Sequence, residues 1–292
     1  MGAEETVAVI GAGGTMGFAM VRNIARAGSN VRAWNRSREK ARPLEHDGAT
    51  VCETPGEAVS GAGIILTMLS DTEAVVESVA DALPSFGEDA VWLQMSTIGE
   101  AGSERCAELA AEHGVAFVDA PVLGSKQPAE QGKLVVLASG PTEVRDRVQP
   151  IFDAIGQKTM WVGEAGAGTR LKLVVNSWVL SVTEATAEMI ALAQALEVDP
   201  PLIFDAVEGG ALDLPYLRMK GKAILEHNFE PMFRLRLAAK DAGLVEESAE
   251  RHGVDVPLYG VIRRQMLKAA QEHGDEDMCA TYFASAPAGI AT

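Results

Sequence analysis

Lys172 and Asn176 are the residues whose types and spacing point most directly to catalysis. They lie four residues apart in a stretch with a helical pattern, so both side chains project from one helix face. That face continues through apolar residues such as Val179 and Val182. Desolvation lowers the pKa of a lysine ammonium and readies it to pass a proton to a carbonyl oxygen. The alternative is a lysine that extends its ammonium to water beside an exposed amide.

A glycine-rich loop near the N-terminus predicts a nucleotide site. The apolar run Val7–Ile10 leads into it, and Phe18–Ala27 is typical of a helix. A strand, tight turn and helix in this order present backbone N–H groups and a positive helix end to a pyrophosphate. The expected cofactor-binding residues here are Gly11, Ala12, Gly13, Gly14, Thr15, Met16 and Gly17. Their spacing departs from GxGxxG, which leaves open which glycine has which role.

The end of the second expected strand, Asn30–Trp34, indicates which dinucleotide binds. NAD-binding folds often carry an acidic residue there that bonds the ribose hydroxyls. Here Asn35, Arg36 and Ser37 follow instead. A guanidinium fork and a hydroxyl suit a 2′-phosphate, so we expect NADP(H). The alternative is that Arg36 is a solvated loop residue and Ser37 only caps a helix over 38–44.

Three further loops follow the expected strands at 64–68, 91–95 and 115–118. Ligands bind beyond the carboxyl ends of parallel strands, so these loops are candidates for the site. We expect the loop after the run 64–68 and the Ser96–Thr97 pair to approach the cofactor and substrate, although this pair could equally cap a helix before Glu100. Lys240, next to Asp241, is a second candidate, with a surface ion pair as its equal alternative. The residues added to the cofactor set are Met68, Leu69, Ser70, Thr97 and Lys240, and those expected at the substrate are Ser96, Val122, Leu123, Gly124, Lys172 and Asn176.

The order of the expected elements predicts an α/β fold with a doubly wound parallel sheet, followed by an all-helical part. Apolar runs at 64–68, 91–95, 115–118 and 134–137 alternate with helical stretches, and a short strand is expected at 159–162. From Gly168 to Glu197 the pattern is almost continuously helical, and helices continue to Glu272. A glycine-rich joint at 163–168 places the expected domains at 1–163 and 164–292, linked by a long helix.

Composition narrows the function class. The chain has 292 residues and a net charge of −16, which disfavours nucleic acid and anionic membranes as partners. A strand expected at residue 7 leaves no room for a signal peptide. Its 3 cysteines and 5 histidines lack metal-site or disulfide spacing, so we expect a cytoplasmic protein without a metal.

Together these residues resemble the β-hydroxyacid dehydrogenase family, and within it most closely the glyoxylate/succinic semialdehyde reductases and 3-hydroxyisobutyrate dehydrogenases. The resemblance runs over nearly the whole chain. The segments that carry it are the glycine loop, Trp34–Ser37, Ser96–Ile98, Asp119–Val122, Gly124–Lys126, Pro128–Glu130, Gly132, Gly166–Asn176 and Lys240–Asp241.

The resemblance implies a Rossmann domain, a helical domain like that of 6-phosphogluconate dehydrogenase, and a homodimer or homotetramer. It also implies NADP(H)-linked interconversion of a small aldehyde or keto acid with a hydroxy acid. In this pattern Lys172 is the general acid and base, and Asn176 positions the substrate or that lysine. Thr97 contacts the nicotinamide end, the segment around Gly124 holds a substrate carboxylate, and Lys240 lines the cleft.

Leu123 departs from the family, which usually has serine after Asp-Ala-Pro-Val. Loss of that hydroxyl removes a carboxylate donor worth roughly 1.5–3 kcal/mol. The substrate is then expected to be larger or less polar than glyoxylate, or not a carboxylate. Two alternatives stay open: an NADPH-dependent imine reductase, although such enzymes generally lack a lysine at position 172, and a non-catalytic NADPH-binding protein of the same fold.

Overall fold

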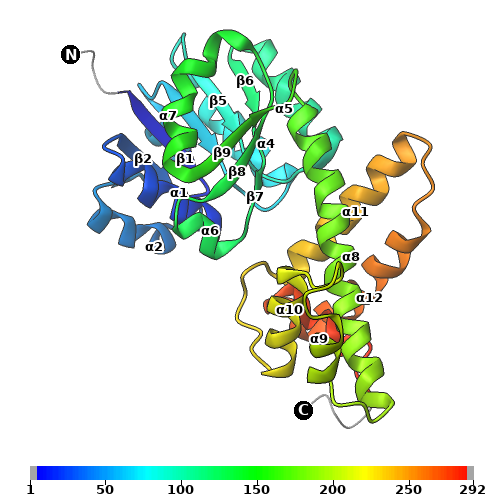
Figure 1. Ribbon diagram of the computed structural model, residues 1–292. Coiled ribbons are helices and arrows are strands. Elements are labelled where there is room, and N and C mark those ends of the chain that lie inside the picture. The colour runs from blue at the N-terminus through cyan, green and yellow to red at the C-terminus, as the bar shows by residue number, and fades with distance from the viewer. Residues whose placement is uncertain (1–4, 288–292) are drawn as a thin grey trace. The chain divides into compact units, whose positions relative to one another are not determined.

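The computed structural model describes residues 5–287, and the chain divides into two compact units, Met1–Lys172 and Leu173–Thr292. The division falls inside the long helix α8 (Ala167–Ala195), which begins in the first unit and continues through the second (Figure 1). None of the helices in the described residues is long and apolar enough to cross a bilayer.

The first unit contains a six-stranded parallel sheet in the order β3-β2-β1-β4-β5-β6, which confirms the predicted doubly wound fold. The strands β1, β4, β5 and β6 are almost entirely buried, as expected for a sheet covered on both faces. The strands of the sheet are β1 (Thr6–Ile10), β2 (Asn30–Trp34), β3 (Thr50–Val51), β4 (Ile64–Thr67), β5 (Val91–Gln94) and β6 (Ala116–Asp119).

Helices cover both faces of this sheet (Figure 1). On one face α1 (Thr15–Arg26) and α7 (Arg145–Ile155) pack on Val7 and Val9, and on the other α3 (Pro55–Val59) and α4 (Thr72–Ala82) pack on Ala8 and Ile10. The remaining helical elements of the unit are α2 (Arg38–Ala41), η1 (Arg42–Asp47), η2 (Leu83–Ser85), α5 (Gly99–Glu112), α6 (Lys126–Glu130) and η3 (Thr142–Val144).

The run at 134–137, which the sequence pattern groups with the parallel sheet, lies in a second sheet instead. β8 (Leu134–Ala138) and β9 (Gly156–Trp161) form a separate three-stranded sheet with β7 (Val122–Leu123), in which β7 runs antiparallel to β8. An apolar run has the same pattern in either sheet, so periodicity could not separate them. The helix predicted over 38–44 also ends early, at Ala41, and a 3₁₀ helix continues the chain with Pro43 in its first turn.

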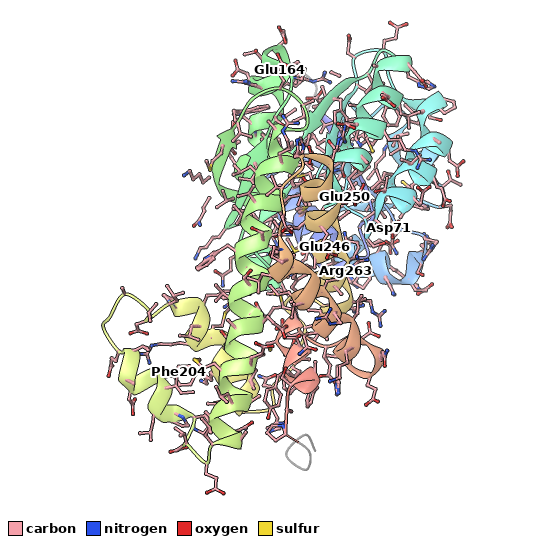
Figure 2. All side chains as sticks on the ribbon, turned by 90° about the vertical axis from the view of Figure 1, so that its right-hand side faces the viewer. Asp71, Glu164, Phe204, Glu246, Glu250 and Arg263 are labelled. Atoms are coloured by element: carbon pink, nitrogen blue, oxygen red, sulfur yellow. The ribbon has the colours of Figure 1, made fainter. Side chains whose placement is uncertain are left out.

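The second unit is helical, as predicted. Besides α8 it contains α9 (Pro201–Val207), α10 (Pro215–Leu225), α11 (Leu235–Arg251), α12 (Pro257–His273) and the 3₁₀ segment η4 (Met278–Ala284). The helical pattern of the sequence covers 200–207, 215–224, 233–252 and 257–272, and these ranges agree with α9–α12 within two residues at each end. Figure 2 marks Phe204 on α9, and Gly221 of α10 meets its ring so closely that a Cβ there would lie 2.4 Å from Phe204.

A buried ion pair ties η4 to α10. Lys220 Nζ lies 2.6 Å from Asp277 Oδ1, and both side chains are at most 4% exposed. Burial by itself would raise the pKa of Asp277, but the charge and hydrogen bond of Lys220 and the N–H of Cys279 outweigh it and lower that pKa. The second carboxylate oxygen accepts from the N–H groups of Met232 and Phe233. One carboxylate therefore holds three segments of the unit together.

Glu184 on α8 is a second buried carboxyl, only 4% exposed. Thr281 donates to its Oε2 at 2.5 Å, while Oε1 has no partner among the described residues. Burial, with a contribution from the like charge of Glu188, raises the pKa of Glu184 to about 7. Near neutral pH this carboxyl is therefore poised between its charged and neutral forms.

The raised pKa of Glu184 predicts a pH-dependent stability. The unfolded carboxyl ionises near 4.5 and the folded one near 7, so its contribution is complete below about 4.5 and is lost as pH rises to about 7. Glu184→Gln removes this loss, and we expect it to stabilise the protein by about 2 kcal/mol more at pH 7.5 than at pH 5.5. Urea unfolding at both pH values measures the difference. Glu188→Gln removes only the smaller cause of the raised pKa, so this control should keep most of the slope; an equal effect of Glu184→Gln at both pH values would contradict the assignment.

Candidate functional site

The structure resolves the roles of two glycines in the loop after β1. Gly11 has φ = +97°, and a Cβ there would lie 2.2 Å from the carbonyl oxygen of Met68. Only glycine tolerates both the left-handed turn and that approach. A Cβ on Gly17 would lie 2.3 Å from the carbonyl oxygen of Gly11. Gly11 therefore makes the turn, and Gly17 allows α1 to pack against the loop.

The backbone amides of the loop divide into two groups. Those of Gly11 and Ala12 donate to the carbonyl of Trp34 at 2.9 and 3.0 Å, so they shape the loop. Within residues 5–287, the amides of Gly13, Thr15 and Met16 have no such acceptor. Thr15 and Met16 begin α1, where the helix dipole favours an anion. The exposed start of α1 therefore fits a pyrophosphate.

Asn35, Arg36 and Ser37 follow β2 beside this loop. Asn35 donates through Nδ2 to the carbonyl of Ser37 at 3.0 Å, and its side chain occupies the space that a Cβ on Gly13 would need. Ser37 is the N-cap of α2 but makes no side-chain capping bond. Arg36 is exposed and has no ion pair or hydrogen bond within the described part of the chain. A free guanidinium thus stands at the end of β2.

Lys40, on α2, is a residue that the sequence reasoning missed. Its Cβ lies 2.8 Å from the position that a Cβ on Gly13 would occupy, so its stem lies against the glycine loop. The signal was its spacing, since Lys40 comes one turn after Ser37. It adds a second cation near Arg36.

Ser96 joins the loops after β4 and β5. Its hydroxyl accepts from the N–H of Leu69 at 2.9 Å and lies 3.4 Å from the carbonyl of Thr67. The side chain of Gln94 bonds both the N–H and the carbonyl of Ser96 at 2.8 Å. Ser96 is fully buried, so in this structure it positions the neighbouring Met68–Ser70 and Thr97 segments. α5 begins two residues after Thr97 and has Ile98 as its N-cap.

The amine of Lys172 lies at the segment that follows β6. Nζ donates to the carbonyl of Val122 at 2.8 Å. Leu123 is the next residue, half-buried on β7, and Gly124 has φ = +122°. A Cβ on Gly124 would meet the side chain of Leu134 at 2.7 Å, which explains the glycine. The structure thus brings together Lys172, Val122 and their neighbours, at the carboxyl end of a parallel strand.

Asn176, one turn further along α8, has its own partner in the second unit. Its Nδ2 donates to Asp241 Oδ2 at 2.8 Å, and both residues are buried. Lys240 Nζ lies 3.0 Å from Asp241 Oδ1, so the ion pair considered from the sequence exists. Asp241 fixes the orientation of the Asn176 amide, which leaves the amide oxygen as an acceptor.

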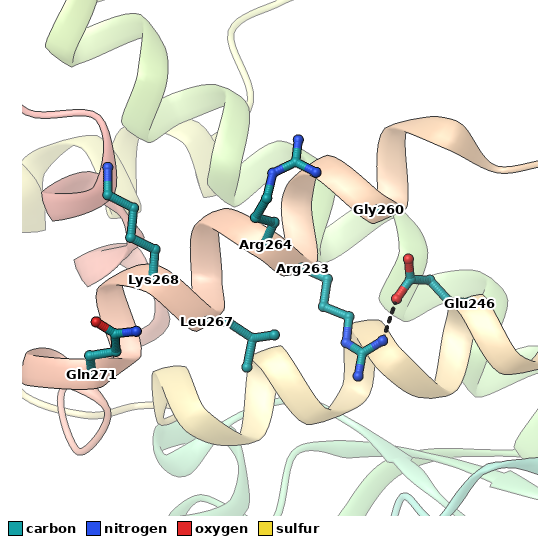
Figure 3. A pocket seen from close by; sticks show the side chains of 7 residues that line it. All are labelled: Glu246, Gly260, Arg263, Arg264, Leu267, Lys268 and Gln271. Atoms are coloured by element: carbon teal, nitrogen blue, oxygen red, sulfur yellow. Dashed lines mark hydrogen bonds and ion pairs between the residues drawn. The ribbon is translucent and has the colours of Figure 1, made fainter.

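A cavity of about 420 Å³ lies elsewhere, between α11 and α12 (Figure 3). Arg263 pairs with Glu246 across it at 2.9 Å. The lining residues are Glu246, Gly260, Arg263, Arg264, Leu267, Lys268 and Gln271. None of them belongs to the predicted site.

Comparison with known proteins places these features in a family. The family model described as the NAD binding domain of 6-phosphogluconate dehydrogenase matches residues 6–163. The model described as NAD-binding of NADP-dependent 3-hydroxyisobutyrate dehydrogenase matches residues 166–284. Glyoxylate/succinic semialdehyde reductase 1 of Arabidopsis thaliana is 32% identical over 259 residues, which cover 88% of this chain and 90% of that protein. The chain belongs to the β-hydroxyacid dehydrogenase family. It is therefore an oxidoreductase that uses NAD(P) and acts on hydroxyl or carbonyl groups.

Solved structures agree with this membership. A 3-hydroxyisobutyrate dehydrogenase from Mycobacterium tuberculosis, solved with L-serine, is 27% identical and superposes with a TM-score of 0.87 over 96% of this chain and 98% of that one. An imine reductase from Myxococcus stipitatus in complex with NADP⁺ is 18% identical, with a TM-score of 0.67 over 94% of this chain and 98% of that one. This second likeness shows the fold alone.

The close approach at Gly17 gives a test of the dinucleotide loop. Gly17→Ala places a methyl group against the backbone of Gly11, and overpacking of this kind costs about 1–3 kcal/mol. We expect NADPH to bind at least about tenfold more weakly, as measured by fluorescence titration.

The matched control for this substitution is Gly14→Ala. A Cβ on Gly14 would meet only the carbonyl oxygen of Gly11, at an ordinary 3.5 Å, and its φ of −80° suits alanine. We expect nearly normal binding. Equal affinities for the two variants would contradict the roles given to these glycines.

Proposed function

We propose that this protein is an NADPH-dependent oxidoreductase that interconverts a small aldehyde or keto acid with the corresponding hydroxy acid. The observation that carries the proposal is the amine of Lys172 bonded to the Val122 carbonyl beyond β6. Ligands in doubly wound folds bind at this edge of the sheet. The kinship with glyoxylate/succinic semialdehyde reductase 1 supports the same class of reaction.

In the proposed mechanism Lys172 holds and moves the proton. Bound NADPH would supply hydride to the carbonyl carbon. Lys172 Nζ donates its proton to the carbonyl oxygen in reduction and takes it back in oxidation. Its bond to Val122 holds Nζ at the segment where the substrate is expected, and the Asn176 amide, oriented by Asp241, bonds the substrate or the lysine.

We propose that the substrate lies against Val122, Leu123 and Gly124. We propose that the amide of Gly124 bonds an oxygen of the substrate, whereas Leu123 offers only an apolar side chain. A substrate larger or less polar than glyoxylate fits this wall. The proposed cofactor contacts are Thr97 and Lys240 near the nicotinamide, and the segment Met68–Ser70 along the dinucleotide.

Preference for NADPH rests on the exposed guanidinium of Arg36. Neighbouring arginines are already paired, for example Arg38, which lies 3.1 Å from Glu53. Arg36 is therefore available to a 2′-phosphate, and Lys40 stands nearby with its stem on the glycine loop. None of the three residues directly after β2, Asn35, Arg36 and Ser37, is acidic, so no carboxylate stands there to select the unphosphorylated ribose.

We also propose a homodimer or homotetramer in the cytoplasm. Three apolar side chains of α8, and Leu196 directly after its end, are 60–66% exposed; the three on the helix are Val174, Trp178 and Leu192. Apolar area on this scale along one helix is typical of a surface that packs against another subunit. Its three cysteines are free and buried, which suits a reducing compartment.

Replacement of Lys172 tests the proposed proton transfer. Lys172→Ala removes the proton donor, and we expect NADPH oxidation across a panel of aldehydes and keto acids to fall on the order of 10²-fold or more. NADPH affinity should change little. Lys158→Ala, in an exposed lysine on β9, is the control that should keep full turnover.

Three outcomes of that assay would overturn the proposal. Unchanged turnover in Lys172→Ala would remove the lysine from the chemistry. Cyclic imines reduced faster than any aldehyde or keto acid would favour an imine reductase. Tight NADPH binding by the wild-type protein without turnover of any substrate would indicate a non-catalytic cofactor-binding protein.

The cofactor preference has a separate test. Hydrogen bonds to a charged group contribute about 1.5–3 kcal/mol, so we expect Arg36→Ala to weaken NADPH roughly 10- to 100-fold and NADH little. Arg38→Ala, whose guanidinium is paired with Glu53, is the matched control. The measurement is the dissociation constant of each coenzyme for the variant and the wild type. An equal loss of affinity for NADPH and NADH would mean that Arg36 does not contact the phosphate.

A further inference from the structure

Asp119, the last residue of β6, is a fully buried carboxylate that the proposed reaction does not use. Its exposure is 0%, so it cannot contact a substrate in this structure. Burial raises its pKa, while hydrogen bonds from Thr169 and Ser139 act in the opposite direction. Burying a carboxylate is costly unless hydrogen bonds satisfy its oxygens.

One of these partners, Thr169, lies in the first turn of α8. The N–H of Thr169 donates to Asp119 Oδ2 at 2.8 Å, and its hydroxyl donates to Oδ1 at 2.7 Å. Thr169 is the third residue of the helix, where backbone N–H groups lack partners inside the helix. Asp119 therefore caps α8 from 50 residues away in the chain, and its charge complements the helix dipole.

Ser139 adds a second attachment at the same place. Its hydroxyl accepts from the N–H of Gly168 at 2.9 Å and lies 3.1 Å from the carbonyl of Asp119. The backbones of Asp119 and Ser139 also bond each other in both directions. A Cβ on Gly168 would lie 2.1 Å from the carbonyl oxygen of Leu137, so the helix start sits directly on the strands.

Lys172 follows Thr169 by three residues, so it stands one helical turn beyond the capped position. Its Nζ bonds the carbonyl of Val122, which follows Asp119 by three residues in the other chain segment. The segment at and just after the end of β6 therefore bonds both Thr169, in the first turn of α8, and Lys172 Nζ. A rotation or shift of the first turn would move Nζ away from Val122.

We propose that Asp119 is a positioning residue for Lys172, which it places by capping the first turn of α8 through Thr169. This inference rests on the proposed function of Lys172. In this proposal Asp119 does not contact the substrate and affects turnover only because it places Lys172.

The kinetic test is a double-mutant cycle. Asp119→Asn removes the charge and one acceptor, and we expect kcat for carbonyl reduction to fall at least about tenfold with NADPH affinity changed less than about twofold. In a Lys172→Ala background the same substitution should have no further effect on kcat. Asp119→Asn that leaves kcat unchanged, or that lowers the residual turnover of Lys172→Ala by the same factor, would overturn the proposal.

Variants of Thr169 keep the test usable should Asp119→Asn fold poorly. Thr169→Val loses the hydroxyl donor and should lower kcat several-fold, whereas Thr169→Ser keeps both donors and should restore it. Thr54→Val is the matched control, because Thr54 caps α3 through the N–H of Glu57 at 3.1 Å. It should lower the melting temperature without changing kcat; an equal loss of kcat in Thr54→Val would mean that the effect is general.

Chemical labelling gives a readout that does not require turnover. The amine of Lys172, released from Val122 in Asp119→Asn, should react several-fold faster with acetic anhydride, as measured by peptide mass spectrometry relative to exposed Lys158. An unchanged ratio would contradict the positioning role. If the wild-type protein reduces no carbonyl compound, the proposed function fails, but the labelling ratio still decides whether Asp119 places Lys172.

Discussion

The attachment of α8 to the end of β6 is the contact on which the position of Lys172, and hence its proposed chemistry, depends. The Asp119 carboxylate at the end of β6 and the Ser139 hydroxyl after β8 accept hydrogen bonds from the first turn of α8. Gly168 in that turn also packs closely against the carbonyl of Leu137 on β8. Because the helix start is fixed there, the lysine one turn later reaches the Val122 carbonyl. The chemistry proposed for Lys172 therefore depends on hydrogen bonds of Asp119, Ser139 and Thr169, to which the proposed reaction gives no contact with the substrate.

The dinucleotide loop also depends on close contacts between backbone segments. Gly11 turns under the carbonyl of Met68, and Gly17 brings α1 onto Gly11. These contacts leave the amides at the start of α1 available to an anion, while Arg36 and Lys40 stand at the end of β2 and on α2. Local cations in a chain with a net charge of −16 suit a small anionic ligand better than an extended polyanion.

Much of the fold was predictable because its signals are local. The run Val7–Ile10 before the glycines, and the four-residue spacing of Lys172 and Asn176, need no knowledge of distant residues. The roles of Gly11 and Gly17 were not predictable, since they depend on the Met68 carbonyl and on how α1 packs. The second sheet was missed for the same reason, because an apolar run does not reveal which strands it pairs with.

The hydrogen-bond partners of the site residues also could not be predicted from the sequence. Asp119 and Thr169 are separated by 50 residues, and Asn176 and Asp241 by 65. A motif shows that such residues are present, but only the folded backbone shows that one carboxylate caps α8 and another orients an amide. Lys40 was overlooked because a lysine on a short helix is usually a solvated residue.

The most direct measurement of the central claim is a crystal structure of the protein with NADP⁺ and a bound hydroxy acid. The account predicts that Lys172 Nζ lies within about 3.2 Å of the hydroxyl oxygen, with α8 still capped by Asp119. A structure in which Nζ points into bulk solvent while another side chain bonds that oxygen would contradict it.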